Sequence, residues 1–593
     1  MGDAASVSHL GLPALFWTMF GVALACCLFD LGDARTFLGD IDDQLREVQI
    51  RHLLFGGGAW WDSSLPMIAS PEPYLSPWSR LVDLPYVCLT MLFAPLLGKE
   101  RALLLSFEVW PLVMLTVFCL LTSLIYRRFR LPASLVGYLI VATATLLMVF
   151  GIWEFVPGRI DHHNAQLLVL LTMIYGLSRW DSWGGRLIGF GAVVSITIAL
   201  EGLPFIVLIF AGLVGGLIFS AQNAVTVVKH ASAVMLVMSL PMGIAMLGPV
   251  AAFSTQCDAY SAPYIFLLTG FGLILWTVSS FMPTGRFWLY CFVLGLSAIA
   301  LLFIFGMVFT PCLAGPYWMI DPVSKAYWFN RVAQEHSALY FIAQGQTAIV
   351  LLAVVLASIL TFATAAIVEE RGPNWFGLAI MLALAWVSLV LTLLLNRYIR
   401  FAFAFAPLFL PLALMYFTAP RHQSFSRLWR NVAVACCGFY VAIAAWFIAV
   451  TPVEEPLYDA VDYMAYDECE KADFSVFGTV EPGRMIAPLG VSLPMLDVLP
   501  SGFSVAAIPF HRASPGMKRV FEAFVSDDAT VRREALAPFD YVAICRFPLK
   551  PDYGTASLYD ALSTGRDWPG LIRLPTGADN PFQLFRIDHA ALQ

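Results

Sequence analysis

The sequence predicts a polytopic α-helical membrane protein of about 13 transmembrane helices with an extracytoplasmic α/β domain at its C-terminal end. The first observation is composition, since 59% of the 593 residues are hydrophobic and only 13% are charged. The second is a succession of apolar runs, most of them close to the roughly 20 residues that a span requires. The third is a change near Pro452 to the mixed composition of a soluble domain. We therefore expect a membrane domain over residues 1–451 and a second domain over 452–593.

The apolar runs predict where the spans lie. In order along the chain they are 10–30, 83–125, 131–153, 164–178, 187–201, 203–221, 231–253, 263–281, 287–309, 345–367, 376–395, 401–418 and 431–451. The first run lacks a charged leading segment and a small-residue cleavage site, so we expect a retained span and not a signal peptide.

Basic residues predict the orientation. They gather on every second connection between the runs, and short cytoplasmic loops collect Lys and Arg. This places the N-terminus in the cytoplasm and the C-terminal domain outside, in a bacterial periplasm. The exception is the segment 396–400, whose two arginines fall on the outer side and need a functional explanation.

The segment after Pro452 has the pattern of a small α/β domain. Its β-rich runs are 474–477, 504–508, 541–545 and 585–587, and its helical stretches are 517–524, 529–536 and 558–562. Four of the eleven cysteines fall in outer segments, where disulfides persist. Cys257 with Cys312 and Cys469 with Cys545 are plausible pairs.

Ionisable residues beside a span are costly to keep, so by default they mark a functional site. The segment 155–166 carries Arg159, Asp161, His162 and His163 between two apolar runs. Asp and His are both ligands for ions such as Mn²⁺. We expect these residues to form a metal site, with one of the two histidines pointing away. The alternative is a helix cap or an ordinary core hydrogen bond.

A second cluster, 39–49, follows the first apolar run and contains Asp42 and Asp43. Carboxylate oxygens suit Mg²⁺ or Mn²⁺, and the alternative is a solvated acidic loop balanced by Arg46 and Arg51. Neither cluster alone supplies the six or so ligands that a divalent ion takes. We therefore expect Asp42 or Asp43 to lie within roughly 10 Å of Asp161, sharing one ion.

Two further segments complete the candidate site. The loop 312–336 is long enough to act as a lid, with Glu335 and His336 as its candidate functional pair, or it is a plain connector. Arg397 and Arg400 carry guanidinium groups that match phosphate geometry. The competing interpretation is that these arginines extend to lipid headgroups.

Four short segments, in this order, resemble the motifs of GT-C glycosyltransferases that use polyprenyl-phosphate sugars, and most closely those of oligosaccharyltransferase catalytic subunits. They are residues 39–43 with Arg46, residues 158–164, residues 332–335 and residues 399–407. The resemblance covers about residues 10–450 and implies a GT-C-like membrane domain with thirteen spans. Two departures are His163 in place of a second acid, and the absence from 452–593 of the Trp-Trp-Asp motif that reads an asparagine sequon. The Trp-Trp-Asp at 60–62 lies in the first outer loop and does not count as that motif.

The resemblance implies a glycosyltransferase that moves a sugar or oligosaccharide from a polyprenyl-(pyro)phosphate donor to a lipid, glycan or protein acceptor at the periplasmic face of the inner membrane. It implies catalytic roles for Asp42, Asp43 and Glu335, donor binding by Arg400, Arg397 and Arg159, and Mg or Mn ligation by Asp43, Asp161, His163 and His162. Two rival hypotheses are a lipid-linked sugar transporter or flippase and a non-catalytic membrane assembly subunit. The expected partners are the lipid-linked donor and membrane lipid, with no nucleic acid.

Overall fold

The computed structural model describes residues 8–31, 41–69, 72–343, 345, 348–369, 372, 374–418, 464, 469, 472–546, 557–577 and 579–592. Contacts divide the chain into two compact units. Unit 1 comprises Met1–Gly39, Ser79–Leu313 and His336–Glu454, and unit 2 comprises Asp40–Trp78, Ala314–Glu335 and Glu455–Gln593. Composition alone assigned residues 40–78 and 314–335 to the membrane domain, whereas their contacts group them with the C-terminal residues.

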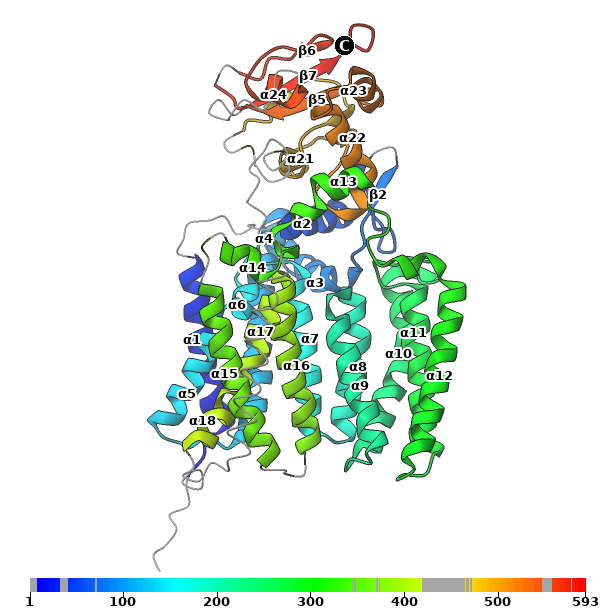
Figure 1. Ribbon diagram of the computed structural model, residues 1–593. Coiled ribbons are helices and arrows are strands. Elements are labelled where there is room, and N and C mark those ends of the chain that lie inside the picture. The colour runs from blue at the N-terminus through cyan, green and yellow to red at the C-terminus, as the bar shows by residue number, and fades with distance from the viewer. Residues whose placement is uncertain are drawn as a thin grey trace, which may run out of the picture. The chain divides into compact units, whose positions relative to one another are not determined.

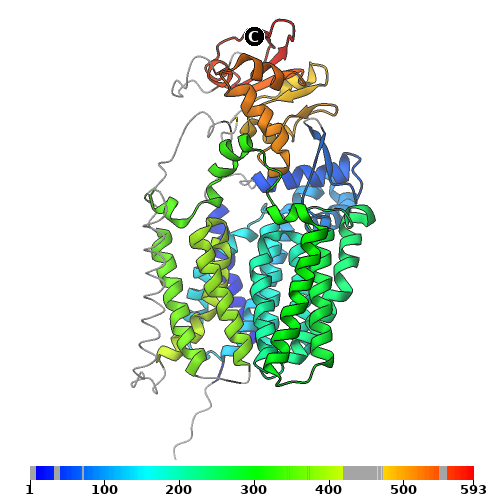
Figure 2. The same ribbon diagram turned by 45° about the vertical axis from the view of Figure 1, so that its right-hand side comes forward.

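Unit 1 is a bundle of long apolar helices (Figure 1 and Figure 2). Its helices are α1 (Leu12–Leu31), α3 (Arg80–Leu97), α4 (Lys99–Tyr126), α5 (Leu135–Leu147), α6 (Val149–Ile152), α7 (His162–Arg179), α8 (Ser182–Ile198), α9 (Leu203–Ile218), α10 (Ala224–Ala251), α11 (Ala262–Phe281), α12 (Phe287–Val308), α14 (Ala338–Ala343), α15 (Ala348–Glu369), α16 (Trp375–Leu394), α17 (Ile399–Phe405) and α18 (Leu410–Thr418). Among the described residues, ten helices are long and apolar enough to cross a membrane, or eleven if the bent pair of α5 and α6 counts as one span. The predicted polytopic helical membrane fold is confirmed, and the expected run 431–451 lies outside the described residues.

The predicted run 83–125 is not one span. Gly98, with a φ of +79°, interrupts it between α3 and α4. Ser79, just before α3, donates through Oγ to Thr197 O in the last turn of α8 at 2.7 Å. The start of α4 lies beside the start of α7, because Gly158 N–H donates to Phe107 O at 3.0 Å. Both ends of α3 therefore lie at the same end of the bundle, and α4 alone crosses it.

Unit 1 has two chemically different ends. We call the end at which α7, α9 and α17 begin the cluster end, and the opposite one the basic end. The helix ends and loops at the basic end carry Arg127, Arg128, Arg130, Arg179, Arg186, Lys229 and Arg286. Arg397, in the turn between α16 and α17, and Arg400, in the first turn of α17, lie at the cluster end. The alternation of basic loops that the sequence predicted is thus a real separation between the two ends.

Glycines let the central helices of unit 1 approach closely. A Cβ on Gly176 of α7 would overlap the backbone of Gly184 in α8, and one on Gly189 would overlap the backbone of Ala231 in α10. Small residues at such crossings are typical of packed membrane helices, because lipid supplies no hydrophobic drive for helix association. This packing holds α7, α8 and α10 together toward the basic end, opposite to the site.

Unit 2 is an α/β structure around one seven-stranded sheet, in the order β2-β1-β4-β3-β5-β7-β6. Its strands are β1 (Ser64–Ala69), β2 (Pro73–Leu75), β3 (Arg484–Ile486), β4 (Ser504–Val505), β5 (Tyr541–Cys545), β6 (Leu571–Arg573) and β7 (Phe582–Ile587). Its helices are α2 (Ile41–Phe55), α13 (Pro322–Tyr327), α21 (Leu489–Met495), α22 (Ser514–Phe524), α23 (Ala529–Leu536) and α24 (Leu558–Ser563). The predicted C-terminal α/β domain is confirmed.

The sheet joins segments that are far apart in the sequence. Strand β1 pairs in parallel with β4, with Ile68 opposite Val505, so the segment that carries β1 and β2 supplies one edge of the sheet. Strand β5 is buried along its whole length between β3 and β7. The expected strand at 474–477 is wrong, because Ser475–Gly478 form a 3₁₀ turn in which Phe477 packs on Phe582.

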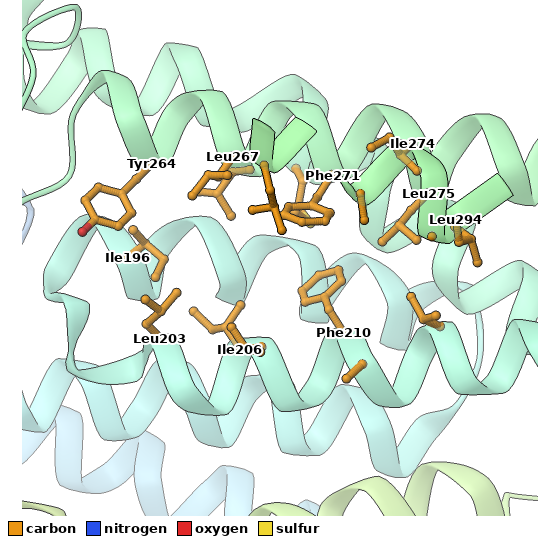
Figure 3. A pocket seen from close by; sticks show the side chains of 18 of the residues that line it. Ile196, Leu203, Ile206, Phe210, Tyr264, Leu267, Phe271, Ile274, Leu275 and Leu294 are labelled. Atoms are coloured by element: carbon orange, nitrogen blue, oxygen red, sulfur yellow. The ribbon is translucent and has the colours of Figure 1, made fainter. Parts of the chain in front are cut away.

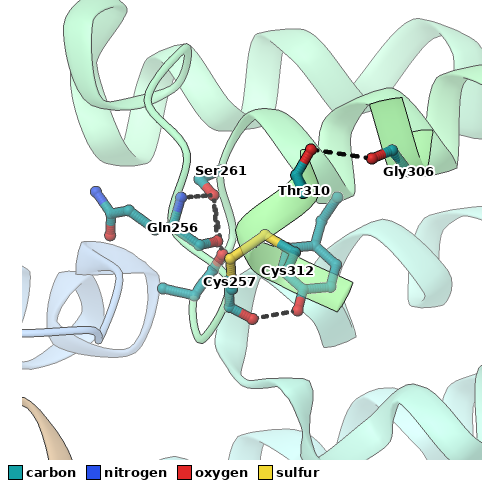
Figure 4. The surroundings of a disulfide bond; sticks show 8 residues. Gln256, Cys257, Ser261, Gly306, Thr310 and Cys312 are labelled. Carbon is teal, nitrogen blue, oxygen red and sulfur yellow. Dashed lines mark hydrogen bonds between the residues drawn. A yellow bond between two sulfur atoms is a disulfide. The ribbon is translucent and has the colours of Figure 1, made fainter. Parts of the chain in front are cut away.

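Both plausible disulfides are present. Cys257 bonds Cys312 with Cα atoms 5.0 Å apart, and Cys469 bonds Cys545 with Cα atoms 5.6 Å apart. The first bond ties the segment before α11 to the segment after α12 (Figure 4). The Ser261 hydroxyl accepts from Gln256 N–H and donates to Gln256 O, so the turn that carries Cys257 is itself held in shape.

Candidate functional site

Asp161 is the centre of a buried ionisable cluster at the cluster end of unit 1. It is the N-cap residue of α7, and the two histidines that follow it both contact its carboxylate. His162 Nδ1 lies 2.5 Å from Asp161 Oδ1, and His163 Nε2 lies 3.1 Å from Asp161 Oδ2. The expectation that one histidine points away is therefore wrong. Backbone geometry at the start of α7 brings both rings, whose centroids are 4.3 Å apart, onto one carboxylate.

Glu201 is a second carboxylate on His163. Its Oε2 lies 2.9 Å from His163 Nδ1, so the imidazole is held between Asp161 on one side and Glu201 on the other. Glu201 belongs to the 3₁₀ turn Leu200–Gly202 that separates α8 from α9. The side chains of Asp161, His163 and Glu201 are each at most about 5% exposed, so these three groups are shielded from bulk water.

Hydrogen bonds with Gln166 hold the turn that carries Glu201. In the orientation that satisfies its amide, the Gln166 oxygen accepts from Ser195 Oγ at 2.5 Å and from Gly202 N–H at 3.2 Å. A Cβ on Gly202 would overlap both the Gln166 amide and the Ser195 hydroxyl. A side chain at residue 202 would therefore displace the Gln166 amide, and Gln166 is part of the support for Glu201.

Arginines flank the carboxylates. Glu154, in the 3₁₀ turn Trp153–Phe155, contacts Arg400 Nη1 through Oε1 and Arg159 Nη2 through Oε2, both at 3.2 Å. Arg397 Nε lies 3.8 Å from Glu201 Oε1. The cluster thus holds the three predicted donor-binding arginines, Arg159, Arg397 and Arg400, together with two acids that the sequence interpretation left out of the site.

The three carboxylates and three guanidinium groups of this cluster balance in formal charge before the histidines are counted. Burying an ion is costly, and pairing only partly offsets the cost, so hydrophobic side chains of similar volume often give a more stable fold. A buried ionic cluster at the end of membrane helices is therefore weak evidence for a stabilising role. It favours a binding or catalytic role instead.

The donor set fits a divalent cation. Ligand atoms of Asp161, His162 and His163 all lie within 4.8 Å of one another. If Nδ1 of His163 donates its proton to Glu201, then Nε2 turns a lone pair toward Asp161 Oδ2 at 3.1 Å. Two lone-pair donors facing each other need a cation or a second proton between them. The carboxylate–histidine arrangement with Glu201 is also the usual means of orienting a metal-binding imidazole.

Arg400 fits an anion. Its side chain is 7% exposed, and among the described residues its Nε has no hydrogen-bond partner. A buried N–H without a partner is costly, so a site of this kind is suited to a ligand oxygen. Glu154 contacts the same guanidinium group through Nη1, so the Nε side of the Arg400 guanidinium can bind a ligand.

The remaining predicted residues belong to unit 2, so the joint ion with Asp161 stays a prediction. Asp42 and Asp43 lie in the first turn of α2, where Asp43 is fully buried. Arg46, one helical turn further on, stacks its guanidinium over Trp78 with 4.4 Å to the ring centroid. Glu335 ends the segment Ala314–Glu335 of unit 2 and is half-buried in the 3₁₀ turn Ala333–Glu335.

His336, the neighbour of Glu335, has a different role. It belongs to unit 1, where its ring stacks on Tyr340 at 4.0 Å. Its carbonyl accepts from Asn396 N–H at 2.9 Å, which ties the end of the loop to the turn that carries Arg397. His336 therefore ties the end of the loop to that turn, and a functional pair with Glu335 stays a prediction.

Two acids of the cluster, Glu154 and Glu201, were missed as site residues, although a signal for both is present. Each is an acid within or at the end of an apolar run, where ionisable residues are rare. Glu154 lies five residues before Arg159, and Glu201 directly precedes the apolar α9. What the sequence cannot indicate is that α8 and α9 turn beside the start of α7.

The fold is that of a multi-pass helical membrane protein with a C-terminal α/β domain, and it resembles the fold of solved oligosaccharyltransferases. No family model matches the chain, and no curated protein matches it. The resemblance therefore rests on structure, and the similarity predicted from the four motifs is confirmed at the level of the fold.

Solved structures of the oligosaccharyltransferase from the archaeon Archaeoglobus fulgidus are similar to this chain. The apo form has a TM-score of 0.59 at 14% identity, covering 97% of this chain and 74% of the other. The complex of that enzyme, AglB, with an inhibitory peptide and a dolichol-phosphate has a TM-score of 0.57 at 13% identity, covering 96% and 74%. A complex with zinc and sulfate has a TM-score of 0.53 at 13% identity, covering 97% and 73%.

Proposed function

We propose that this protein is a membrane glycosyltransferase that moves a sugar or an oligosaccharide from a polyprenyl-(pyro)phosphate donor to an acceptor. The observation that carries the proposal is the buried cluster in which Asp161, His163 and Glu201 adjoin Arg397 and Arg400. A cation site beside a phosphate-matching guanidinium is the arrangement that a phosphate leaving group requires. The similar archaeal enzyme, solved with a dolichol-phosphate, supports a lipid-linked donor.

In the proposed reaction an acceptor oxygen or nitrogen attacks the anomeric carbon of the donor, and the bond from that carbon to the phosphate oxygen breaks. Arg400, positioned by Glu154, binds the phosphate oxygens, and Arg397 and Arg159 add positive charge beside them. A divalent ion, when bound, supplies Lewis-acid neutralisation of the leaving phosphate. Asp161, His163 and His162 would hold that ion, and Glu201 would orient His163. We propose that Asp43 and Glu335 complete its ligands and that Asp42 accepts the proton of the acceptor.

We further propose that the cluster end faces a bacterial periplasm. The basic loops gather at the opposite end of unit 1, as cytoplasmic loops do. Two disulfides, one of them in unit 2, suit an oxidising compartment. The acceptor is proposed to be a lipid or a cell-envelope glycan, with protein a less favoured choice, because residues 452–593 contain no Trp-Trp-Asp motif.

A transporter would place ionisable groups along a path through the membrane. In the described helices the buried acids and arginines collect at the ends of the bundle, which favours surface chemistry over passage. The deciding test is consumption of donor by the purified full-length protein, reconstituted in lipid, with a panel of polyprenyl-linked sugars. We expect sugar release or transfer from at least one donor, with loss of turnover in a chelator and recovery on adding Mg²⁺ or Mn²⁺.

Movement of an intact donor across the bilayer without cleavage would instead establish the flippase alternative. Absence of both reactions, together with a change only in the yield of a larger complex when Asp161 is replaced, would establish an assembly subunit.

A further inference from the structure

The loop 312–336 has both of its ends in unit 1 and its middle in unit 2. Cys312 bonds Cys257, just before α11, and the carbonyl of His336 accepts from Asn396 N–H at 2.9 Å. Residues Ala314–Glu335, between these two points, belong to unit 2 by their contacts. What holds the middle of the loop on unit 2 therefore bears directly on the position of Glu335.

The middle of the loop is part of the hydrophobic core of unit 2. Ile320 and Trp328, on either side of α13, are 9% and 6% exposed and belong to the same core cluster as the strands of the sheet. The Tyr327 ring contacts Phe521 of α22, with centroids 5.4 Å apart. This segment cannot leave unit 2 without exposing large apolar side chains to water, which is unfavourable.

A buried hydrogen-bond network fastens α13 to the start of α22. Asp321 is the N-cap of α13, and its Oδ1 accepts from Val323 N–H at 2.9 Å and from Ser324 N–H at 3.0 Å. Its Oδ2 accepts from the hydroxyl of Ser514 at 2.5 Å, and Ser514 Oγ in turn accepts from Asp321 N–H at 2.9 Å. Ser514 is fully buried. Asp321 and Ser514 thus bind each other in both directions, although they belong to distant segments of the chain.

This cap does more than end a helix. Asp528 is also an N-cap in unit 2, but its exposed side chain accepts from Thr530 N–H within its own helix, α23. Capping requires no more than that, since one side-chain oxygen satisfies one or two of the first N–H groups. The additional bonds between Asp321 and Ser514 connect two elements, and Asp528 provides a matched comparison.

The two ends of the loop are attached to parts of unit 1 that are packed differently. Cys312 follows α12, and a cavity of about 730 Å³ separates the α11–α12 hairpin from α9, with Phe271 and Phe210 on opposite sides (Figure 3). Side chains that line a cavity lack neighbours on that side. Asn396 instead begins the turn that leads into α17, where every residue after Ile399 is buried. The attachment at Asn396 is therefore the firmer of the two.

The connection from unit 2 to this firm attachment is short. The residues between Trp328 and His336 form two 3₁₀ turns, Phe329–Arg331 and Ala333–Glu335. A 3₁₀ turn rises only about 2.0 Å per residue, well below the reach of an extended chain. If Trp328 moved away, these turns would have to unwind, and Glu335 is in the second of them.

We propose that Asp321 and Ser514 are positioning residues for Glu335. Their mutual hydrogen bonds hold α13 on unit 2, so the turn that carries Glu335 keeps one conformation between Trp328 and His336. The inference rests on the proposed function for the role of Glu335 in transfer, and on the hydrogen bonds alone for its position.

Hydrogen exchange of the full-length protein in lipid bilayers tests the position of the loop without any substrate. In Asp321→Ala and in Ser514→Ala, the amides of residues 320–336 should exchange about tenfold faster or more, the effect of losing a hydrogen bond to a charged group. The Asn396 amide should also exchange faster, because it donates to His336 O at the end of the same connection.

Asp528→Ala is the matched control. It removes a helix cap from unit 2, but the faster exchange should stay within α23, where its partner Thr530 lies. In all three variants the amides of β5 and β7 should remain protected, which shows that unit 2 is folded.

Donor consumption provides the functional readout. In Asp321→Ala we expect kcat to fall by about 10–100-fold, the range for losing a group that orients a metal ligand. The donor KM should stay unchanged, because Glu154 holds Arg400 within unit 1. Asp321→Asn keeps an N-cap and can donate an N–H to Ser514 Oγ, so it should recover most of kcat.

Unchanged exchange of residues 329–336 in both variants, with β5 and β7 still protected, would overturn the inference. So would a kcat equal to that of the unaltered protein, or a raised donor KM at constant kcat. Exchange needs no sugar transfer, so the two proposals fail separately. A protein that shows the expected exchange but consumes no donor loses the proposed function, and an active protein with unaltered exchange loses only the role of Asp321 and Ser514.

Discussion

The two ends of unit 1 contain the same kinds of charged residue in opposite environments. At the basic end, Arg179 and Asp181 form a 2.8 Å ion pair with side chains 31% and 42% exposed. At the cluster end, Arg400 and Glu154 form a 3.2 Å pair with side chains 7% and 12% exposed. Water stabilises the first pair without help, whereas the second is maintained against a desolvation cost. Under the proposed function, charges at the basic end serve orientation in the membrane and those at the cluster end serve a ligand.

The largest expected effect is that of Asp161→Asn, which keeps the shape of the side chain and removes the charge that faces both histidines. We expect donor turnover to fall by about 10²–10³-fold, the range for removing one group that stabilises a transition state. Asp527→Asn, at an exposed position in unit 2, is the matched control and should leave turnover unchanged. Initial rates of donor consumption give the comparison, and equal rates in the two variants would mean that the buried cluster is not the reaction site.

Arg400→Ala should weaken donor binding by about 1.5–3 kcal/mol, the value of a hydrogen bond to a charged group. Arg400→Lys should recover part of it, because an ammonium restores charge but not the planar fork. Arg286→Ala removes an exposed arginine at the basic end and should have no effect. Donor affinity measured by calorimetry distinguishes these variants. If Arg286→Ala lowered donor affinity as much as Arg400→Ala, the two ends of unit 1 would not differ in the proposed way.

Glu201→Gln should have a smaller effect, since Glu201 acts through His163. Loss of a partner that orients a metal-binding histidine costs typically 10–100-fold in metal affinity. We expect a weaker Mn²⁺ affinity in titrations of the purified protein, with donor affinity without metal little changed. Glu481→Gln, exposed in unit 2, is the control. A loss of donor affinity without any change in Mn²⁺ affinity would mean that Glu201 acts by positioning Arg397 and not by orienting His163.

The smallest effect belongs to Arg179→Ala at the basic end. The exposed pair should contribute about 0–1 kcal/mol to stability and nothing to turnover. The hydrogen bond from Arg179 holds the pKa of the Asp181 carboxyl below its usual range. Stability from this pair is therefore present above the unfolded pKa of an aspartate and is lost as the pH falls through the lowered value. Thermal unfolding of both proteins should differ slightly at neutral pH and converge in acid.

The fold was predictable wherever composition or an apolar run decides it. Helices α1 and α7 to α12 follow their predicted runs. Helix α3 was not predicted as a separate helix, because the run 83–125 was taken as one span across the break at Gly98. Strands β5 and β7 were found from their β-rich runs. The pairing of β1 with β4 was not, because it joins Ile68 to Val505 across more than four hundred residues of sequence.

The site was predictable in its residue types and not in its partners. Asp161, His163 and Arg400 were identified as ionisable groups beside spans, and the structure brings them into one buried cluster. Glu154 and Glu201 join that cluster only because two helix ends turn toward α7, which is a tertiary contact. The ring stack of His336 on Tyr340 is likewise a tertiary contact that its residue type does not indicate.

The central claim is that Asp161 and His163 hold a divalent cation beside the donor phosphate, and Mn²⁺ electron paramagnetic resonance tests it most directly. In the full-length protein with a polyprenyl-phosphate donor, we expect bound Mn²⁺ to show magnetic coupling to an imidazole nitrogen and to phosphorus. The nitrogen coupling should be reduced in His163→Ala, where only the His162 imidazole remains, and the phosphorus coupling should weaken in Arg400→Ala. Bound Mn²⁺ with an unchanged nitrogen signal in His163→Ala, or no bound Mn²⁺ at all, would contradict the account.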